Sequence, residues 1–139
     1  MILLDTNVLS ALMTARPDAT VASWMDRQPR DSVWITSVTL MELRFGLRSM
    51  PAGKKKEALV GKLDILLSHK IDRRVAPFDA AAAEQTAKLM ATRRQIGRVV
   101  ELRDTMIAGI ALSCNASLAT RNVAHFRELA NRLINPWTD

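Results

Sequence analysis

Three acidic side chains stand where an apolar stretch of the sequence meets a turn or a helix. Asp5 follows the apolar run 2–4, Glu42 lies inside the apolar stretch 38–50, and Asp104 falls in the first turn of another helical pattern. Carboxylates that converge without matching bases repel one another and raise one another's pKa values. A divalent cation removes this repulsion, and a set of oxygen ligands selects a hard ion such as Mg²⁺ or Mn²⁺. The pattern therefore favours a metal site built from these three acids.

Each acid also has a purely structural explanation. Asp5 can cap the helix that follows it, and Asp104 is favoured in a first helical turn by the helix dipole alone. Glu42 can complete a capping box that starts at Thr39, although Thr36 is the better helix start. A buried carboxylate without a partner is costly, so we expect a cation or a strong hydrogen-bond donor beside Glu42.

The sequence contains no cluster of cysteine and histidine that would suit zinc. Cys114 is the only cysteine, so it has no partner within the chain, and its apolar helical surroundings predict a small core residue. His69 stands alone near the end of a predicted helix, and we expect it to be structural. The candidate metal ligands are therefore oxygen atoms.

Strands and helices alternate along the chain, which predicts an α/β fold with a parallel sheet covered on both faces. Short apolar or β-branched runs predict strands at residues 2–4, 33–35, 74–76, 117–120 and 132–137. The spacing of apolar residues predicts helices at 8–13, 19–27, 38–50, 54–70, 80–96, 104–114 and 124–130. The helix at 38–50 is apolar nearly all round, so we expect it to be buried on most sides.

The carboxyl ends of parallel strands lie at one edge of the sheet, and the ligands of open α/β sheets bind there. Asp5 follows the first predicted strand, and Asn122 follows the fourth. The helices that carry Glu42 and Asp104 are expected to begin at the same edge. These four side chains should therefore meet, although they are far apart in the sequence.

The composition favours one globular domain, residues 1–139, with an anionic partner. Hydrophobic residues make up 48% of the chain and charged residues 24%, which excludes a disordered chain. The formal net charge of +6 favours a phosphate-bearing partner over a merely solvated basic surface. Because the chain has three Trp, three Phe and no Tyr, base stacking on an aromatic platform is not expected to dominate nucleic-acid binding.

Two further features of the sequence bear on its cellular location. No apolar run approaches the roughly 20 residues that a membrane helix needs. No basic segment precedes the first apolar residues, as it would in a signal peptide. We therefore expect a cytoplasmic protein with no membrane contact.

Four segments of the sequence resemble the PIN-domain ribonucleases, and among these the VapC toxins and their FitB-like relatives. The segments are residues 4–8 (LDTNV), 42–46 (ELRFG), 104–108 (DTMIA) and 119–122 (ATRN). Residues 51–54, 77–79 and 134–137 are also similar to that group, so the resemblance covers essentially the whole chain. It implies a PIN-like fold, with a central parallel sheet of about five strands between helices.

The resemblance also implies roles for individual residues. Asp5, Glu42 and Asp104 match the family's core acids, which are catalytic and hold Mg²⁺ or Mn²⁺. The fourth family position is often Asp and is Asn122 here, which can coordinate or hydrogen-bond a metal-bound water but brings no charge. One resting metal ion and two both remain open. Glu101 stands where the family often has Ser or Thr, and we expect no role for it.

The activity implied by the resemblance is cleavage of RNA. A metal-activated water would hydrolyse a phosphodiester bond. Thr6 would orient Asp5 or contact phosphate, and Arg121 or Arg44 would hold the RNA backbone. The implied partners are a small antitoxin that blocks the pocket, a second copy of the chain in a homodimer, and operator DNA through the antitoxin complex only. These features describe the toxin of a type II toxin–antitoxin module.

Two other interpretations compete with this one. The first is a catalytically weak PIN scaffold that binds RNA or an antitoxin as a regulatory partner, which the uncharged Asn122 would favour. The second is a phosphoacceptor receiver domain, a different acidic α/β fold. Receiver domains usually have an acidic pair after the first strand and a Lys after a late strand. This chain instead has Asp5 alone after the first strand, and Thr120, Arg121 and Asn122 after the late one.

Overall fold

Five short parallel strands form the centre of the molecule, in the spatial order β3-β2-β1-β4-β5. The computed structural model describes all 139 residues. The strands are β1 (Ile2–Leu4), β2 (Val33–Thr36), β3 (Val75–Ala76), β4 (Ser117–Ala119) and β5 (Leu133–Ile134). This arrangement confirms the predicted α/β fold and puts the first strand of the chain in the middle of the sheet.

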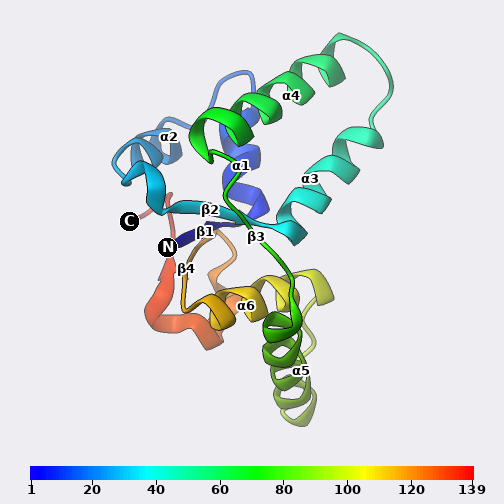
Figure 1. Ribbon diagram of the computed structural model, residues 1–139, viewed down its shortest axis with the longest axis vertical. Helices are drawn as coiled ribbons and strands as arrows, with labels where there is room; N and C mark the ends of the chain where they lie inside the picture. Colours follow the sequence, from blue (N-terminus) through cyan, green and yellow to red (C-terminus); the bar gives the residue numbers. More distant parts are fainter.

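Helices cover both faces of the sheet (Figure 1). One face carries α1 (Thr6–Met13), α2 (Ala19–Asp26), α3 (Ser37–Arg48) and α4 (Lys54–Ile65), which a π-helical turn, η2 (Leu66–Lys70), extends. The other face carries α5 (Ala80–Gln95), α6 (Leu102–Cys114) and the kinked 3₁₀ segment η3 (Val123–Arg132). A 3₁₀ turn, η1 (Arg30–Ser32), leads into β2. No helix combines the length and the apolar character that crossing a membrane requires.

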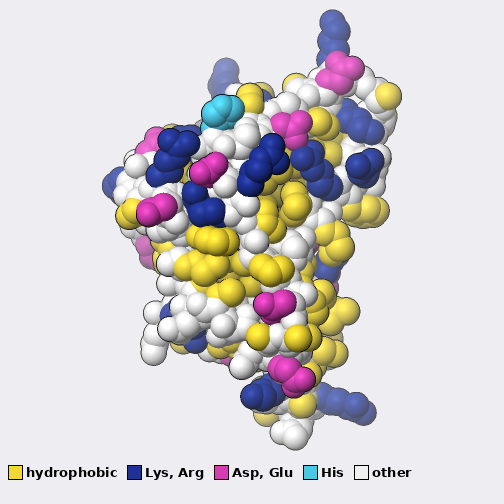
Figure 2. Space-filling view, in the orientation of Figure 1, with side chains coloured by type: hydrophobic (Ala, Val, Ile, Leu, Met, Phe, Trp, Pro, Cys, Tyr) yellow, Lys and Arg dark blue, Asp and Glu magenta, His cyan; other side chains and the backbone are white.

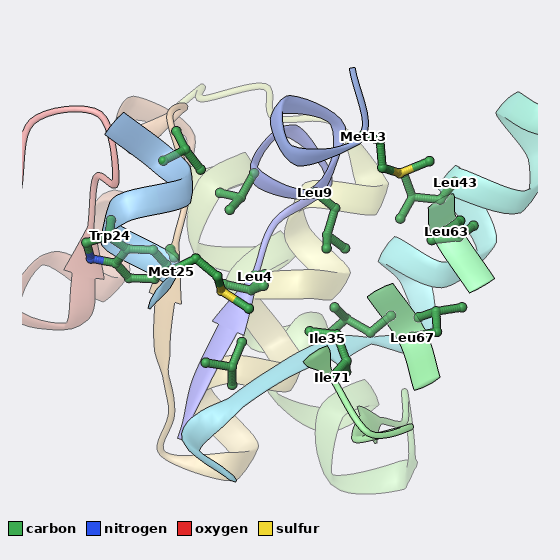
Figure 3. Packing of buried hydrophobic residues seen from close by; sticks show 14 of the residues in the cluster. Leu4, Leu9, Met13, Trp24, Met25, Ile35, Leu43, Leu63, Leu67 and Ile71 are labelled. Atoms are coloured by element: carbon green, nitrogen blue, oxygen red, sulfur yellow. The ribbon is translucent and has the colours of Figure 1, made fainter. Parts of the chain in front are cut away.

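The apolar run of β1 is buried from both sides because successive side chains of a strand point to opposite faces of the sheet. Leu4 packs in one cluster with residues of α1 to α4, among them Leu43 (Figure 3). Leu3 packs in a second cluster with α5, α6 and η3, which includes Ile107 and Phe126. The two clusters hold the layers together and fix the position of β1, and therefore of Asp5, the residue that follows it.

The helix boundaries follow from local capping. The hydroxyl of Thr36 accepts a hydrogen bond from the backbone N–H of Thr39 at 3.0 Å, so α3 begins at Ser37 and no capping box starts at Thr39. Asp79 caps α5 in the same way through the backbone N–H of Ala82 at 2.9 Å. These caps confirm the helix starts that the sequence favoured.

Two predictions about burial are wrong. Met41 and Phe45 of α3 are 50% and 65% exposed, because only the side of α3 that carries Leu43 and Leu47 packs into the core. Cys114 is exposed as well, because it ends α6 where the chain leaves the helix through Asn115 in a left-handed conformation. Apolar composition alone did not reveal which face of these helices meets the sheet.

Strand register decides what meets at the carboxyl edge of the sheet. Leu4 lies opposite Ile35 on one side and opposite Ala119 on the other. The residues that follow these three are Asp5, Thr36 and Thr120, which are all polar and all buried. Polar side chains are therefore gathered at the point where β1 turns into α1.

Candidate active site

Asp5 occupies the central position at this edge. Its Oδ1 atom accepts a hydrogen bond from the backbone N–H of Thr6, and its Oδ2 atom accepts one from the hydroxyl of Thr120, both at 2.8 Å. The side chain is 4% exposed. Asp5 thus caps α1 and also presents a fixed carboxylate to the pocket beside it, so the structural and the functional explanations are compatible.

The turns that follow β1 and β4 are tied to each other. The side-chain amide of Asn7 donates to Oδ2 of Asp5 at 3.3 Å, and its Oδ1 atom accepts from the backbone N–H of Arg121 at 3.2 Å. The hydroxyl of Thr120 accepts from the backbone N–H of Asn122 at 3.0 Å. The sequence pattern gave no separate role to Asn7 or Thr120, yet both orient the residues that it selected.

Glu42 reaches the same place from α3. The hydroxyl of Thr6 donates a hydrogen bond to Oε1 of Glu42 at 3.1 Å, and the guanidinium of Arg103 lies 3.7 Å from Oε2. A hydroxyl donor and a cation therefore accompany this half-buried carboxylate, as its position in an apolar stretch predicts. Thr6 links the end of the first strand to α3.

Asp104 lies in the first turn of α6, and its partner is a histidine. Nδ1 of His125, in η3, lies 2.8 Å from Oδ2 of Asp104. No motif or spacing in the sequence singled out His125. The signal was its place three residues after Asn122, in the turn that leaves β4 at the carboxyl edge.

One open pocket of about 780 Å³ brings the candidate residues together. Asp5, Glu42, Asp104, Asn122, Thr6 and Arg121 all line it, as do His125, Glu101 and Trp137. Arg44 does not line it; its guanidinium instead lies 2.8 Å from Oδ1 of Asp64 on α4. Six of the seven predicted site residues therefore share one cavity.

The acids of the pocket affect one another. Burial is the main reason why the pKa of Asp5 lies above its ordinary value, and the negative charge of Asp104 raises it further, against the hydrogen bonds from Thr120 and Thr6. Burial also raises the pKa of Glu42 above its ordinary value, and the charges of Asp5 and Asp104 add to this effect. A cation placed among these groups would stabilise their ionised forms.

Comparison with known proteins places this arrangement in a family. Residues 2–131 match the family model described as PIN domain. The chain belongs to the PIN-domain family. This confirms the resemblance read from the sequence and excludes the receiver-domain interpretation, since a receiver is a different fold.

Relatives match this PIN domain along nearly its whole length. It is 39% identical over 137 residues to the VapC ribonuclease Y4jK of Sinorhizobium fredii, which covers 99% of this chain and 98% of the relative. It is 32% identical over 139 residues to the toxin FitB of Neisseria gonorrhoeae, with both chains covered in full. The solved structure of FitAB bound to an IR36 DNA fragment matches with a TM-score of 0.89 at 29% identity, covering 100% of this chain and 97% of that one.

The donor set of this PIN domain fits a hard divalent cation in its chemistry. The acids and Asn122 offer only oxygen ligands, and the pKa values of Asp5 and Glu42 are raised in part by the acids around them. The arrangement does not form a closed cage, however, because no three His, Cys, Asp or Glu side chains come close enough to hold one ion between them. Each carboxylate is instead engaged by a hydrogen-bonding partner of its own.

Proposed function

We propose that this PIN domain is a metal-dependent endoribonuclease that hydrolyses RNA phosphodiester bonds. The main support is that Asp5, Glu42 and Asp104, from three separate elements, line one pocket with Asn122. The relative Y4jK is named a ribonuclease. The whole chain has a net charge of +6, which suits a polyanionic substrate, while its acidic pocket suits a cationic cofactor.

Asp5, Glu42 and Asp104 would hold Mg²⁺ or Mn²⁺, with Asn122 as an uncharged fourth ligand or as a hydrogen-bond partner of water. Such an ion, when bound, supplies an acidified water and polarises a phosphate. The chain's own contribution is orientation: Thr120 holds Asp5, Thr6 holds Glu42, and His125 holds Asp104. These contacts fix each carboxylate at the pocket, and binding one ion between the three acids would require their side chains to move closer together.

Arg121 is the better of the two predicted RNA-binding arginines. It lines the pocket, and its guanidinium carbon lies 5.0 Å from the ring centroid of Trp137. Stacking on an indole restricts the guanidinium while its N–H groups stay free to bind phosphate. Arg44 pairs with Asp64 outside the pocket, so any contact it makes would be to more distant RNA. In the view of Figure 2 most Lys and Arg side chains lie over α2 to α4, on the side of the sheet that carries Arg44.

The same proposal includes the role of toxin in a type II toxin–antitoxin module. The relative FitB is named a toxin, and the similar FitAB structure is a DNA complex, which supports a small antitoxin partner and operator contact through that partner. Exposed apolar side chains on α3 and around the start of α6, among them Phe45, Val99 and Leu102, support a homodimer. An enzyme acting on cellular RNA would work in the cytoplasm.

The deciding experiment compares cleavage of bulk RNA in Mg²⁺ and in EDTA. We expect the wild-type chain to cleave only in Mg²⁺ and Asp5→Asn to lose that activity. Asp26→Asn, an equal change at an exposed site at the end of α2, should keep it. Cleavage by Asp5→Asn at the wild-type rate would refute the site. RNA binding by the wild-type chain without any cleavage would favour the regulatory scaffold.

A further inference from the structure

Arg93 is a buried cation on α5 that lies outside the candidate active-site pocket. It is 3% exposed, and its guanidinium donates four hydrogen bonds. Two of them, both 2.9 Å long, go to the carboxylate of Glu128 in η3. A bidentate pair of this kind fixes the plane of the guanidinium as well as its position.

The other two hydrogen bonds of Arg93 go to α6 and η3, two elements that line the candidate active-site pocket. Nη1 donates to the hydroxyl of Thr105 at 2.7 Å, and Nη2 donates to the backbone carbonyl of His125 at 3.1 Å. Thr105 directly follows Asp104, and its hydroxyl also donates to the carbonyl of Glu101 at 2.9 Å, which ties it to the start of α6. One planar group therefore binds α6 at Thr105, next to Asp104, and η3 at His125.

These are the two elements whose side chains meet in the pocket, where Nδ1 of His125 contacts Oδ2 of Asp104. Asp104 and His125 are 21 residues apart in the sequence, so no local interaction brings them together. Arg93 contacts both α6 and η3 from outside the pocket. A displacement of a reacting group by about 1 Å can lower the rate by about 10²-fold. A residue that sets the distance between Asp104 and His125 would therefore affect catalysis.

We propose that Arg93 is a positioning residue of the active site, which holds Asp104 and His125 in contact through Thr105 and the His125 backbone. This inference rests on the proposed nuclease function. Arg93 touches neither substrate nor metal. Lys at this position would keep the charge but could not bond Glu128, Thr105 and His125 at once, since it lacks the rigid fork of N–H donors.

Arg98 provides a matched control. It shares Glu128 with Arg93 through a 2.6 Å contact, and it also donates to the carbonyl of Ala124, but it bonds neither Thr105 nor His125. Arg93→Lys should lower kcat by about 10- to 100-fold at saturating Mg²⁺ with little change in KM, whereas Arg98→Lys should leave kcat nearly unchanged. Both variants are assayed well below their thermal midpoints.

A second measurement does not depend on activity. The chain has two histidines, so the imidazole ¹⁵N signals of His125 can be assigned by comparison with His69→Gln. We expect these signals to be the same in the wild type and in Arg98→Lys and to shift in Arg93→Lys. If Arg93→Lys does not fold, Thr105→Val, which removes one acceptor of Arg93, should give the same two changes.

The outcomes separate the two proposals. Equal losses of kcat in the Arg93 and Arg98 variants would overturn the positioning role, because both would then act through Glu128 and general stability. An unchanged His125 spectrum in Arg93→Lys would overturn it too. A wild-type chain that cuts no RNA would defeat the proposed function, while a selective shift of the His125 signals would still support the positioning of this pair by Arg93.

Discussion

The hydroxyl of Thr120 lies 2.8 Å from Oδ2 of Asp5, although 115 residues separate the two in the sequence. This contact exists because β1 and β4 are adjacent parallel strands and end in register. The hydroxyl also accepts the backbone N–H of Asn122. A single buried oxygen therefore couples Asp5, a candidate metal ligand, to the turn that carries Asn122, the fourth candidate ligand.

Thr120→Val should weaken both stability and divalent-ion binding. Valine has a similar shape but removes the shorter of the two hydrogen bonds to Oδ2 of Asp5 and takes away the acceptor of the Asn122 backbone N–H. A hydrogen bond to a charged group contributes about 1.5–3 kcal/mol. Calorimetric titration with Mn²⁺ and urea unfolding measure the two effects. Thr120→Ser, which keeps the hydroxyl, should behave much more like the wild type. If the Ser and Val variants bind Mn²⁺ equally, the hydroxyl has no part in positioning Asp5.

Asn122→Asp should tighten binding of the divalent cation. The change adds a negative charge at the edge of the acidic pocket, and one ion-contacting charge near a protein surface is worth from about 1 to 4 kcal/mol. We expect the dissociation constant for Mn²⁺ to fall by about tenfold or more. Asn131→Asp adds the same charge at an exposed site in η3 that does not line the pocket. An equal gain in both variants would show a general charge effect and leave Asn122 without a ligand role.

Gly109→Ala should destabilise the packing of α5 against α6. A methyl group at position 109 would lie 2.8 Å from the carbonyl oxygen of Ala82 and would overlap the hydroxyl of Thr86. Overpacking of this kind costs about 1–3 kcal/mol. Gly46→Ala on α3, where the added methyl meets nothing within 4 Å, should instead stabilise by up to about 1 kcal/mol. Urea midpoints that move in the same direction for Gly109→Ala and Gly46→Ala would contradict the close approach of α5 and α6.

Glu128 should make stability depend on pH in the acidic range. Its hydrogen bond with Arg93 is the main cause that lowers its pKa from 4.5 to about 2. A lowered native pKa means that the stabilisation is complete above about pH 4.5 and is lost as the pH falls from there towards 2. Solvent screens this partly exposed pair, so the effect is on the order of 1 kcal/mol. Urea unfolding at a series of pH values should show this loss in the wild type and a smaller one in Glu128→Gln. Parallel curves for the two chains would rule out the ion pair as its source.

Local signals in the sequence determined the elements of this fold. The apolar run before Asp5 and the runs before Thr36 and Thr120 became the three central strands, because strands buried on both faces need no polar alternation. Caps such as Thr36 and Asp79 fixed helix starts through hydrogen bonds that span three residues. Parallel strands, together with helices expected to begin at the same edge, predicted that Asp5, Glu42 and Asp104 would lie close together, and all three line one pocket.

Only the tertiary structure decided how those acids are held. The partners of Asp104 and Glu42 are His125 and Thr6, and Arg44 turns to Asp64, because these contacts depend on the distances between elements and not on sequence spacing. The exposed faces of α3 and α6 have the same origin, since an apolar sequence does not state which side meets the sheet. Short-range hydrogen bonds and hydropathy patterns depend on residues that are close in the sequence, so they can be predicted from it. Contacts between distant segments form only when the packed layers fix where each helix lies.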